Sequence, residues 1–400
     1  MLLRPRGIAE WVWASAAATL LVALGLVPVP NALDALRRGD DVYLFLAGMM
    51  VLAETARREG VFDWIAAHAV AAARGSGLRL FALVYGTGVV VTAVLSNDAT
   101  AVVLTPAVAA AVRATGARPL PYLYACAFVA NAASFILPIS NPANLVIFGS
   151  ALPPLGRWLA ALALPALVAV AVTFVALLWL SREELRAPLD AAPGAPRLGA
   201  PGRVALAAIA TTAVLLSAAS ARGLPLGAAT GAAAVLTLVA VTFFDRDALT
   251  SVPRGAAWSV LALVAGLFVI VQALDRTGLL ELARQAALRA AHLPQVTGTL
   301  AVAATTALVS NLANNLPSGL VAGTAVAALH GGEAIRNATA LGIDLGPNLS
   351  VTGSLATVLW LAELRRESID LDAFAFLRAG AVVMPPALVL ATLTLALAAR

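Results

Sequence analysis

The stretch TAVLSNDATA at Thr92–Ala101 places hydrogen-bonding side chains in the middle of an apolar segment. A similar stretch, TALVSNLANN, lies at Thr306–Asn315. The apolar arms beside each stretch are about 15 residues long, whereas a helix needs roughly 20 to cross a bilayer. Irregular backbone at membrane depth must be covered by protein or line a watered cavity. We therefore expect two re-entrant hairpins, about 79–113 and 296–330, with their tips in a binding site.

The composition of the chain indicates a protein that is dissolved in lipid. Of its 400 residues, 61% are hydrophobic and only 12% are charged, against about 25% charged residues in soluble domains. Apolar windows such as 11–30, 155–180 and 374–399 reach the length of a bilayer span. The amphipathic segments 62–73 and 279–292 are expected to lie in the interface. We expect an all-α, multi-pass membrane protein with about nine to ten transmembrane helices, two re-entrant hairpins and two broken helices.

The basic and thiol residues narrow the classes of function. The chain contains no lysine, so it lacks the Gly-rich, Lys-Ser/Thr loop that holds nucleotide phosphates, and we do not expect an enzyme. Its net charge of +5 comes from arginines in short connecting segments, which fits membrane topology better than nucleic-acid binding. Cys126 is the single cysteine, so the chain offers no site of three thiolates. We expect no cofactor, no metal and no nucleic-acid partner.

The two parts of the chain on either side of a polar stretch resemble each other. This stretch, 181–203, is rich in Pro, Gly and Arg, and we expect it to be a cytoplasmic loop between a first repeat, 1–180, and a second repeat, 204–400. Three features recur in the same order on both sides, as in transporters with inverted repeats. The matched segments are Leu46–Gly60 with Val264–Gly278, Thr92–Asn97 with Thr306–Asn311, and Asn144–Ser150 with Asn348–Ser354.

Each half also contains an apolar segment that proline, glycine and asparagine interrupt. The interruptions lie at Leu137–Asn144 and Leu345–Ser350. Proline removes a helical hydrogen bond and clashes with the preceding turn. We therefore expect broken helices at about 121–151 and 334–363, which are typical of substrate sites near the bilayer midplane.

Polar side chains gather at the hairpin tips and at the helix breaks. In lipid, polar side chains without hydrogen-bond partners raise the free energy of the folded protein. The N-termini of half-helices at the breaks supply backbone N–H donors that converge on one place. We expect these amides and hydroxyls to bind the substrate, although they could instead only satisfy backbone groups that the breaks set free. The candidate substrate-binding residues are Ser96, Asn97, Thr100, Asn141, Asn144, Ser310, Asn311, Asn314, Asn315, Asn348, Ser350 and Thr352.

Two carboxyl groups accompany these polar clusters. Asp98 lies at the first tip, where the second tip has Leu312, and Asp344 precedes the second break. A low dielectric favours the neutral form of a carboxyl group, so Asp98 and Asp344 are candidates for proton coupling. The alternative for Asp98 is an ionised cap of the following helix. Glu54 is expected to form an interfacial ion pair with the arginines that follow it.

Taken together, these motifs resemble those of the bacterial arsenical pump membrane proteins, a family of the ion transporter superfamily. The resemblance extends from about Tyr43 to the C-terminus, and its last motif is the most specific. The segments that carry it are Leu95–Ala101 with Leu104–Pro106, Ala130–Ser134 with Ser140–Asn141, Asn314–Pro317, and Asp344–Asn348 with Gly353–Leu361.

The resemblance implies secondary active efflux of arsenite and antimonite from the cytoplasm in exchange for protons, by an elevator movement of a transport domain along a scaffold. The expected partners are arsenite or antimonite, protons and the lipid bilayer. A soluble ATPase and a second copy of the chain, in a homodimer, are candidate partners. Arsenous acid is neutral and rich in hydroxyl groups at neutral pH, so amides and hydroxyls can replace its water.

Two alternatives remain open. The first is a sodium/proton antiporter or an organic-anion carrier of the same superfamily. No arginine or lysine lies in a break to neutralise a dicarboxylate, and Asp98 stands where sodium-coupled relatives carry threonine, which disfavours this alternative. The second is a non-transporting membrane subunit that docks a soluble partner. Such a subunit needs no buried polar site, so the paired breaks disfavour it.

Overall fold

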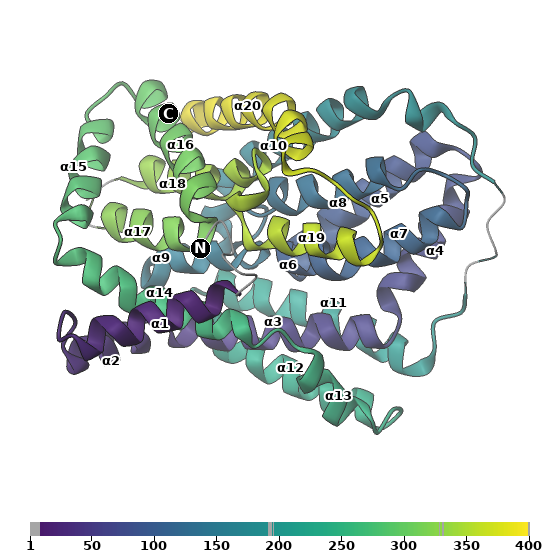
Figure 1. Ribbon diagram of the computed structural model, residues 1–400, viewed down its shortest axis with the longest axis horizontal. Helices are drawn as coiled ribbons and strands as arrows, with labels where there is room; N and C mark the ends of the chain where they lie inside the picture. Colours follow the sequence, from purple (N-terminus) through teal and green to yellow (C-terminus); the bar gives the residue numbers. More distant parts are fainter. Residues whose placement is uncertain (1–8, 191–193, 195, 328, 330–331, 399–400) are drawn as a thin grey trace.

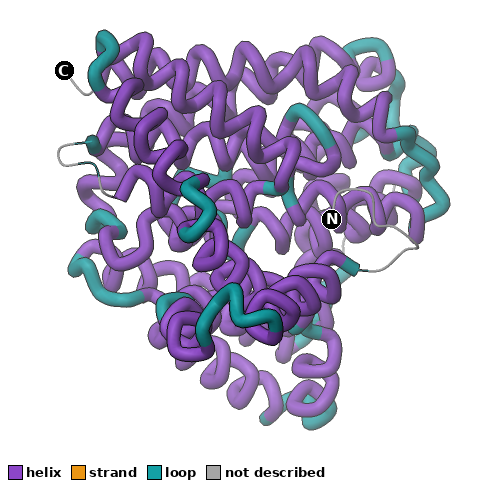
Figure 2. The backbone as a smooth tube through the Cα atoms, turned by 60° about the vertical axis from the view of Figure 1, so that its left-hand side comes forward, coloured by secondary structure: helices purple, strands orange, loops and turns teal. Residues whose placement is uncertain are grey.

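A computed structural model describes residues 9–190, 194, 196–327, 329 and 332–398, and this part of the chain consists of helices joined by loops, with no strand (Figures 1 and 2). The helices of the first half are α1 (Glu10–Ala23), α2 (Val29–Arg37), α3 (Asp40–Arg58), α4 (Val61–Ala73), α5 (Gly77–Val94), α6 (Asn97–Ala99), α7 (Thr105–Arg113), α8 (Leu120–Ala132), α9 (Pro142–Phe148) and α10 (Leu155–Ser181). Those of the second half are α11 (Ala200–Ala221), α12 (Leu226–Thr242), α13 (Ala248–Gly255), α14 (Ser259–Asp275), α15 (Leu279–Ala291), α16 (Gln295–Ala313), α17 (Asn315–Ala327), α18 (Glu333–Leu345), α19 (Leu355–Arg366) and α20 (Ala373–Ala398).

Five helices of the described chain are long and apolar enough to cross a bilayer alone, namely α5, α10, α11, α16 and α20. Helices α13 and α14 meet at a bend of 43° and together make a sixth candidate span. Other apolar helices, among them α4, α8 and α12, are shorter. The expected count of about nine to ten crossings would need shorter helices to cross as well, and it stays a prediction.

The first arm of each expected hairpin is longer than the sequence analysis predicted. Helix α5 has 18 residues and α16 has 19, and both are apolar enough to cross, so the expectation of short arms was wrong for them. The reason is that alanine and threonine near each tip continue the helix instead of ending it. The second arms are shorter, because α17 has 13 residues and the segment after Ser96 is divided into α6, a π-helical turn at Thr100–Leu104 and α7.

The two ends of the α5–α7 segment return to the same place. The loop that follows α10 donates from Leu189 N to Gly75 O (3.0 Å) and from Asp190 N to Thr115 O (3.0 Å). One short loop therefore holds both ends of the segment, so the chain turns back at Ser96. Residues 191–193 and 195 of the expected inter-repeat loop, and 328 and 330 at the end of the second expected hairpin, lie outside the described residues.

A lower layer contains α1, α3, α12, α13 and α14, while α5, α8, α10 and α16–α20 lie above it (Figure 1). Helix α3 packs against α12, and α1 packs against α14. In both pairs a glycine allows close approach, since a Cβ at Gly48 would lie 2.7 Å from Thr230 O and one at Gly266 would lie 2.8 Å from the Ala14 carbonyl carbon. Gly48 and Gly266 occupy matched positions in the two halves.

We expect Gly48→Ala and Gly266→Ala each to destabilise the protein by about 1–3 kcal/mol, because the added methyl group must push the facing backbone away. Unfolding of the detergent-solubilised protein, followed by circular dichroism against temperature, measures the effect. Gly86→Ala is the matched control, since no atom lies within 4 Å of the new Cβ, and alanine favours the helix by up to about 1 kcal/mol. Equal midpoints for all three variants would contradict the close packing of these pairs.

Both expected interruptions lie between helices. Helix α8 ends at Ala132, and the chain passes through a 3₁₀ turn before α9 begins at Pro142. Helix α18 ends at Leu345, and two 3₁₀ turns precede Leu355, where α19 begins. The two segments expected in the interface form α4 and α15.

Candidate functional site

The first tip is built by local hydrogen bonds. Ser96 caps α6, because its Oγ accepts from Ala99 N (3.2 Å), and Asn97 Oδ1 accepts from Asp98 N (2.9 Å). Thr100 Oγ1 lies 2.8 Å from Thr92 Oγ1, which ties the π-helical turn to α5. The helix cap at this tip is therefore Ser96, and the alternative of Asp98 as the cap was wrong.

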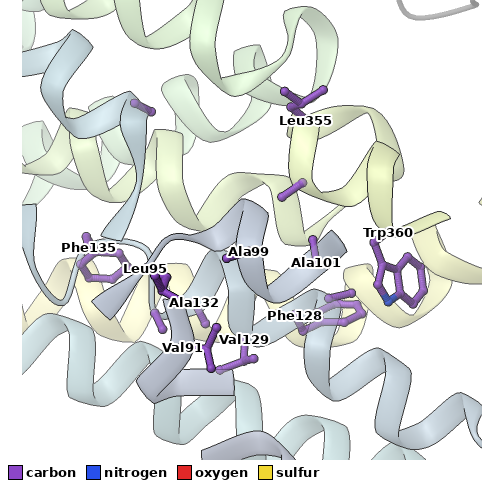
Figure 3. Close-up of a cluster of buried hydrophobic side chains, with 14 of the residues drawn as sticks. Val91, Leu95, Ala99, Ala101, Phe128, Val129, Ala132, Phe135, Leu355 and Trp360 are labelled. Atoms are coloured by element: carbon purple, nitrogen blue, oxygen red, sulfur yellow. The ribbon is translucent and has the colours of Figure 1, made fainter. Parts of the chain in front are cut away.

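Asp98 lies beside apolar residues of the first tip. Ala99 and Ala101 are buried in an apolar cluster with Phe128 and Val129 of α8 (Figure 3). Asp98 instead lines a cavity between the tip and the lower layer. No hydrogen bond to its carboxyl group comes from the described part of the chain.

Hydrogen bonds join the first break to the end of α5 and also form within the break. Ser140 Oγ donates to Ala93 O (3.2 Å) and accepts from Leu137 N (3.1 Å). Asn141 Oδ1 accepts from Ala143 N (3.0 Å), so Asn141 caps α9. These bonds satisfy backbone groups that the break exposes, which is the role that the alternative reading of the sequence gave to the amides.

The second tip and the second break form one network. Asn311 Nδ2 donates to Gly346 O (2.9 Å), and Asn311 Oδ1 accepts from Ser350 Oγ (2.6 Å). Thr352 Oγ1 donates to Asn311 O (2.9 Å). Asn314 joins α16 to α17 with a φ of 72°, the left-handed region that asparagine tolerates better than most residues. The side chains here therefore hold the tip against the break.

The two breaks are joined by side chains from opposite halves of the chain. Asn141 Nδ2 donates to Asp344 Oδ1 (2.7 Å). Asn131 Nδ2 donates to Asn348 Oδ1 (3.0 Å), and Asn131 Oδ1 accepts from Ser354 Oγ (3.2 Å). All five residues are buried. The site is thus a single polar core that both halves build inside an apolar protein.

Three buried oxygens in this region receive no hydrogen bond from the described residues. They are Asn144 Oδ1, Asn315 Oδ1 and Asp344 Oδ2. The Asn144 side chain is close enough to Asp344 to interact with its carboxyl group. Asn315 lies one turn before Gly319, where a Cβ would lie 3.3 Å from Ile147 of α9 and 3.6 Å from Ile343 of α18. Asn315 thus stands on the face of α17 that packs toward both helices. Each buried acceptor without a donor lowers the stability of the protein by about 1–3 kcal/mol.

The structure separates the candidate residues into two groups. The oxygens of Asn144, Asn315 and Asp344 have no hydrogen-bond donor among the described residues, and Asp98 lines a cavity. The remaining candidates form hydrogen bonds within the protein, and they are Ser96, Asn97, Thr100, Asn141, Ser310, Asn311, Asn314, Asn348, Ser350 and Thr352. No group of three or more His, Cys, Asp or Glu side chains gathers as metal ligands would in the part of the chain that the structure describes.

Sequence reasoning missed Asn131 and Ser354 as site residues. Asn131 lies in the apolar helix α8 and is fully buried. A buried amide in an apolar helix needs a partner, and that need was the available signal. The partner itself, Asn348, is far away along the chain and could not be chosen among the many asparagines.

Proteins that resemble this chain are described as transporters or pump membrane proteins. The sequence profile of the citrate transporter family CitMHS matches residues 2–345. The arsenical pump membrane protein of Escherichia coli strain K12 is 27% identical over 417 aligned positions, which cover 98% of this chain and 95% of the relative. That of Yersinia enterocolitica is 25% identical and covers the same shares.

A solved structure shares the fold. The YdaH transporter of Alcanivorax borkumensis, described as having an unusual topology, superposes with a TM-score of 0.59 and covers 97% of both chains. The sequence identity is 16%, so this likeness concerns the arrangement of the helices alone.

Proposed function

This chain belongs to the CitMHS family of membrane transporters, described as citrate transporters, and we propose that it exports arsenite and antimonite from the cytoplasm in exchange for protons. The chain is a multi-pass protein of the bacterial inner membrane. The names of its arsenical pump relatives support the choice of substrate.

The observation that carries the proposal is the set of three buried acceptor oxygens on Asn144, Asn315 and Asp344. Arsenous acid is a small, neutral molecule with three hydroxyl groups, and each hydroxyl can donate one hydrogen bond. It therefore matches three acceptors that the protein leaves unpaired, and it brings no charge that would need a counter-ion. Antimonous acid has the same donors on a larger central atom.

An organic anion fits this site less well. Arginine is absent from both tips and both breaks, and the chain contains no lysine. Carboxylates of a substrate would meet acceptor oxygens and the carboxyl group of Asp344, without a cation to pair with. Transfer of an unpaired charge out of water is costly. The site thus disfavours citrate and dicarboxylates, although the family is described as citrate transporters.

Exchange requires that proton and substrate exclude each other. Asp344 meets this need, because its Oδ2 either carries a proton or accepts a hydroxyl of the substrate, while Oδ1 stays bonded to Asn141. Asp98 is a second proton carrier, which exchanges protons with the cavity that it lines. Substrate binding in the inward-facing state thereby favours loss of a proton to the cytoplasm.

The transport movement is an elevator movement of two inverted repeats. The glycines at matched positions, Gly48 and Gly266, lie in equivalent contacts of the lower layer, which supports a repeat and favours this layer as the scaffold. The tips and breaks, joined by Asn131 and Asn348, move together as the transport unit. A soluble ATPase and a second copy of the chain remain proposed partners.

Reconstitution of the purified chain into liposomes tests the proposal. Proton-driven uptake into vesicles of inverted orientation is measured for arsenite, antimonite, sodium, succinate and citrate in parallel. We expect arsenite and antimonite to accumulate only when the vesicle interior is more acidic than the exterior, because protons then leave the vesicle as the substrate enters. Collapse of the pH gradient by sodium, or uptake of citrate or succinate without arsenite, would contradict the proposal. Transport without an added ATPase would also exclude a mere docking subunit.

A further inference from the structure

A cavity of about 100 Å³ separates the first tip from the lower layer. Its wall includes Ser96 and Asp98 of the tip, Pro142 of the first break, and Met49 and Glu54 of α3. The volume holds several water molecules. The cavity therefore reaches both the proposed proton carrier at the tip and the residue next to Asn141.

Glu54 and Asp98 are the only ionisable residues in the wall of this cavity among the described residues. They come from the two different layers, since Glu54 lies on α3 and Asp98 on the tip. The rest of the wall is mostly apolar, with side chains such as Met49, Met50 and Val102 that cannot carry a proton. A proton that leaves Asp98 into this cavity has Glu54 as its next acceptor.

Glu54 lies near the end of α3 that meets the expected cytoplasmic loop, since a Cβ at Gly202 would lie 2.7 Å from Glu59 O. Arg57 donates to it through Nε (2.7 Å) and through the NH2 nitrogen (2.5 Å). The Glu54 side chain is 10% exposed, whereas that of Arg57 is 52% exposed. Gly255 closes the opposite side, because a Cβ there would lie 2.1 Å from Glu54 Oε1. The ion pair thus spans the short distance between the cavity and solvent.

Other charged groups surround the pair. Asp63 of α4 and Glu363 of α19 are close enough to Arg57 to act on its charge. Arg254 is the neighbour of Gly255 in α13. None of these three groups lines the cavity. They therefore do not offer a path between Asp98 and solvent that avoids Glu54.

We propose that Glu54 relays the coupling proton between Asp98 and the cytoplasm, an inference that rests on the proposed proton exchange. The proton leaves the Asp98 carboxyl group, crosses the water of the cavity and binds a Glu54 oxygen in place of one hydrogen bond from Arg57. It then leaves for the cytoplasm, and the ion pair with Arg57 forms again. No other group changes its charge in this sequence.

Glu54→Gln in reconstituted vesicles tests the relay with two assays. Proton-driven arsenite transport is expected to fall by about tenfold or more, the lower range of effects from a lost proton-transfer group. Exchange of labelled for unlabelled arsenite at equal pH needs no proton release, and it is expected to stay within about twofold. Glu54→Asp is expected to recover part of the proton-driven rate with an altered pH profile.

Glu281→Gln is the matched control, because Arg284 holds Glu281 through the same two nitrogens, at 2.8 and 2.7 Å, in the exposed helix α15. It should leave both assays unchanged. The relay would be overturned if the parent protein transports and Glu54→Gln either keeps the parent's proton-driven rate or loses activity equally in both assays. Failure of the parent protein in both assays would overturn the proposed function and the relay with it.

Discussion

Asp344→Asn is expected to abolish arsenite transport in both assays, proton-driven uptake and arsenite exchange. In one orientation the new amide turns the unpaired Oδ2 into a donor, which cannot accept a hydroxyl of the substrate. In the other orientation its NH2 group faces the NH2 group of Asn141, which now bonds to Asp344 Oδ1. Either mismatch costs about 1–3 kcal/mol, so arsenite binding should weaken about tenfold to hundredfold. Direct binding to the purified protein, by isothermal titration, measures this loss.

The control for Asp344→Asn is Asp34→Asn on α2, whose carboxyl group is 63% exposed. It removes the same charge from the chain, and it should leave binding and both transport assays unchanged. Circular dichroism and the elution profile in detergent establish that each variant is folded. Normal arsenite binding by folded Asp344→Asn would rule out Asp344 as a substrate acceptor.

The positions of the tips and breaks could be predicted because their causes are local. Asn141 and Pro142 start α9 after the first break, and Gly346 and Pro347 end α18 at the second, by their own backbone chemistry. The ion pair of Glu54 with Arg57 is also local, and the structure confirms it. The lengths of α5 and α16 were misjudged because alanine and threonine near each tip continue the helix up to the tip.

The sequence could not predict which amide oxygens are hydrogen-bonded within the protein and which have no donor. Asn97, Asn144 and Asn348 have the same side chain in the same kind of sequence, yet only Asn144 keeps an oxygen without a donor. Whether an amide is satisfied depends on what packs against it, and the partner of Asn348, Asn131, comes from the other half of the chain. The cavity between Glu54 and Asp98 is likewise a product of tertiary packing. A single sequence holds no record of which distant residues meet.

Asp98→Asn should abolish proton-driven arsenite uptake and leave arsenite exchange within about twofold of the parent rate. The change keeps the size of the side chain, and the carboxyl group forms no hydrogen bond with the described residues, so the tip should keep its shape. Ser96 still caps α6, and Ala99 and Ala101 still pack against α8. What is lost is a group that can carry a proton into the cavity, a contribution of about 100-fold or more. Parallel uptake and exchange assays in one vesicle preparation measure the difference.

The contrast between the two aspartates separates coupling from binding. If Asp98 serves only the proton, its asparagine variant binds arsenite normally, whereas Asp344→Asn does not. Equal loss of exchange in both variants would mean that Asp98 belongs to the substrate site or supports the tip. Unchanged proton-driven uptake in Asp98→Asn would remove it from the proton path altogether. Glu54 would then have no donor across the cavity, and the relay would fail for the same reason.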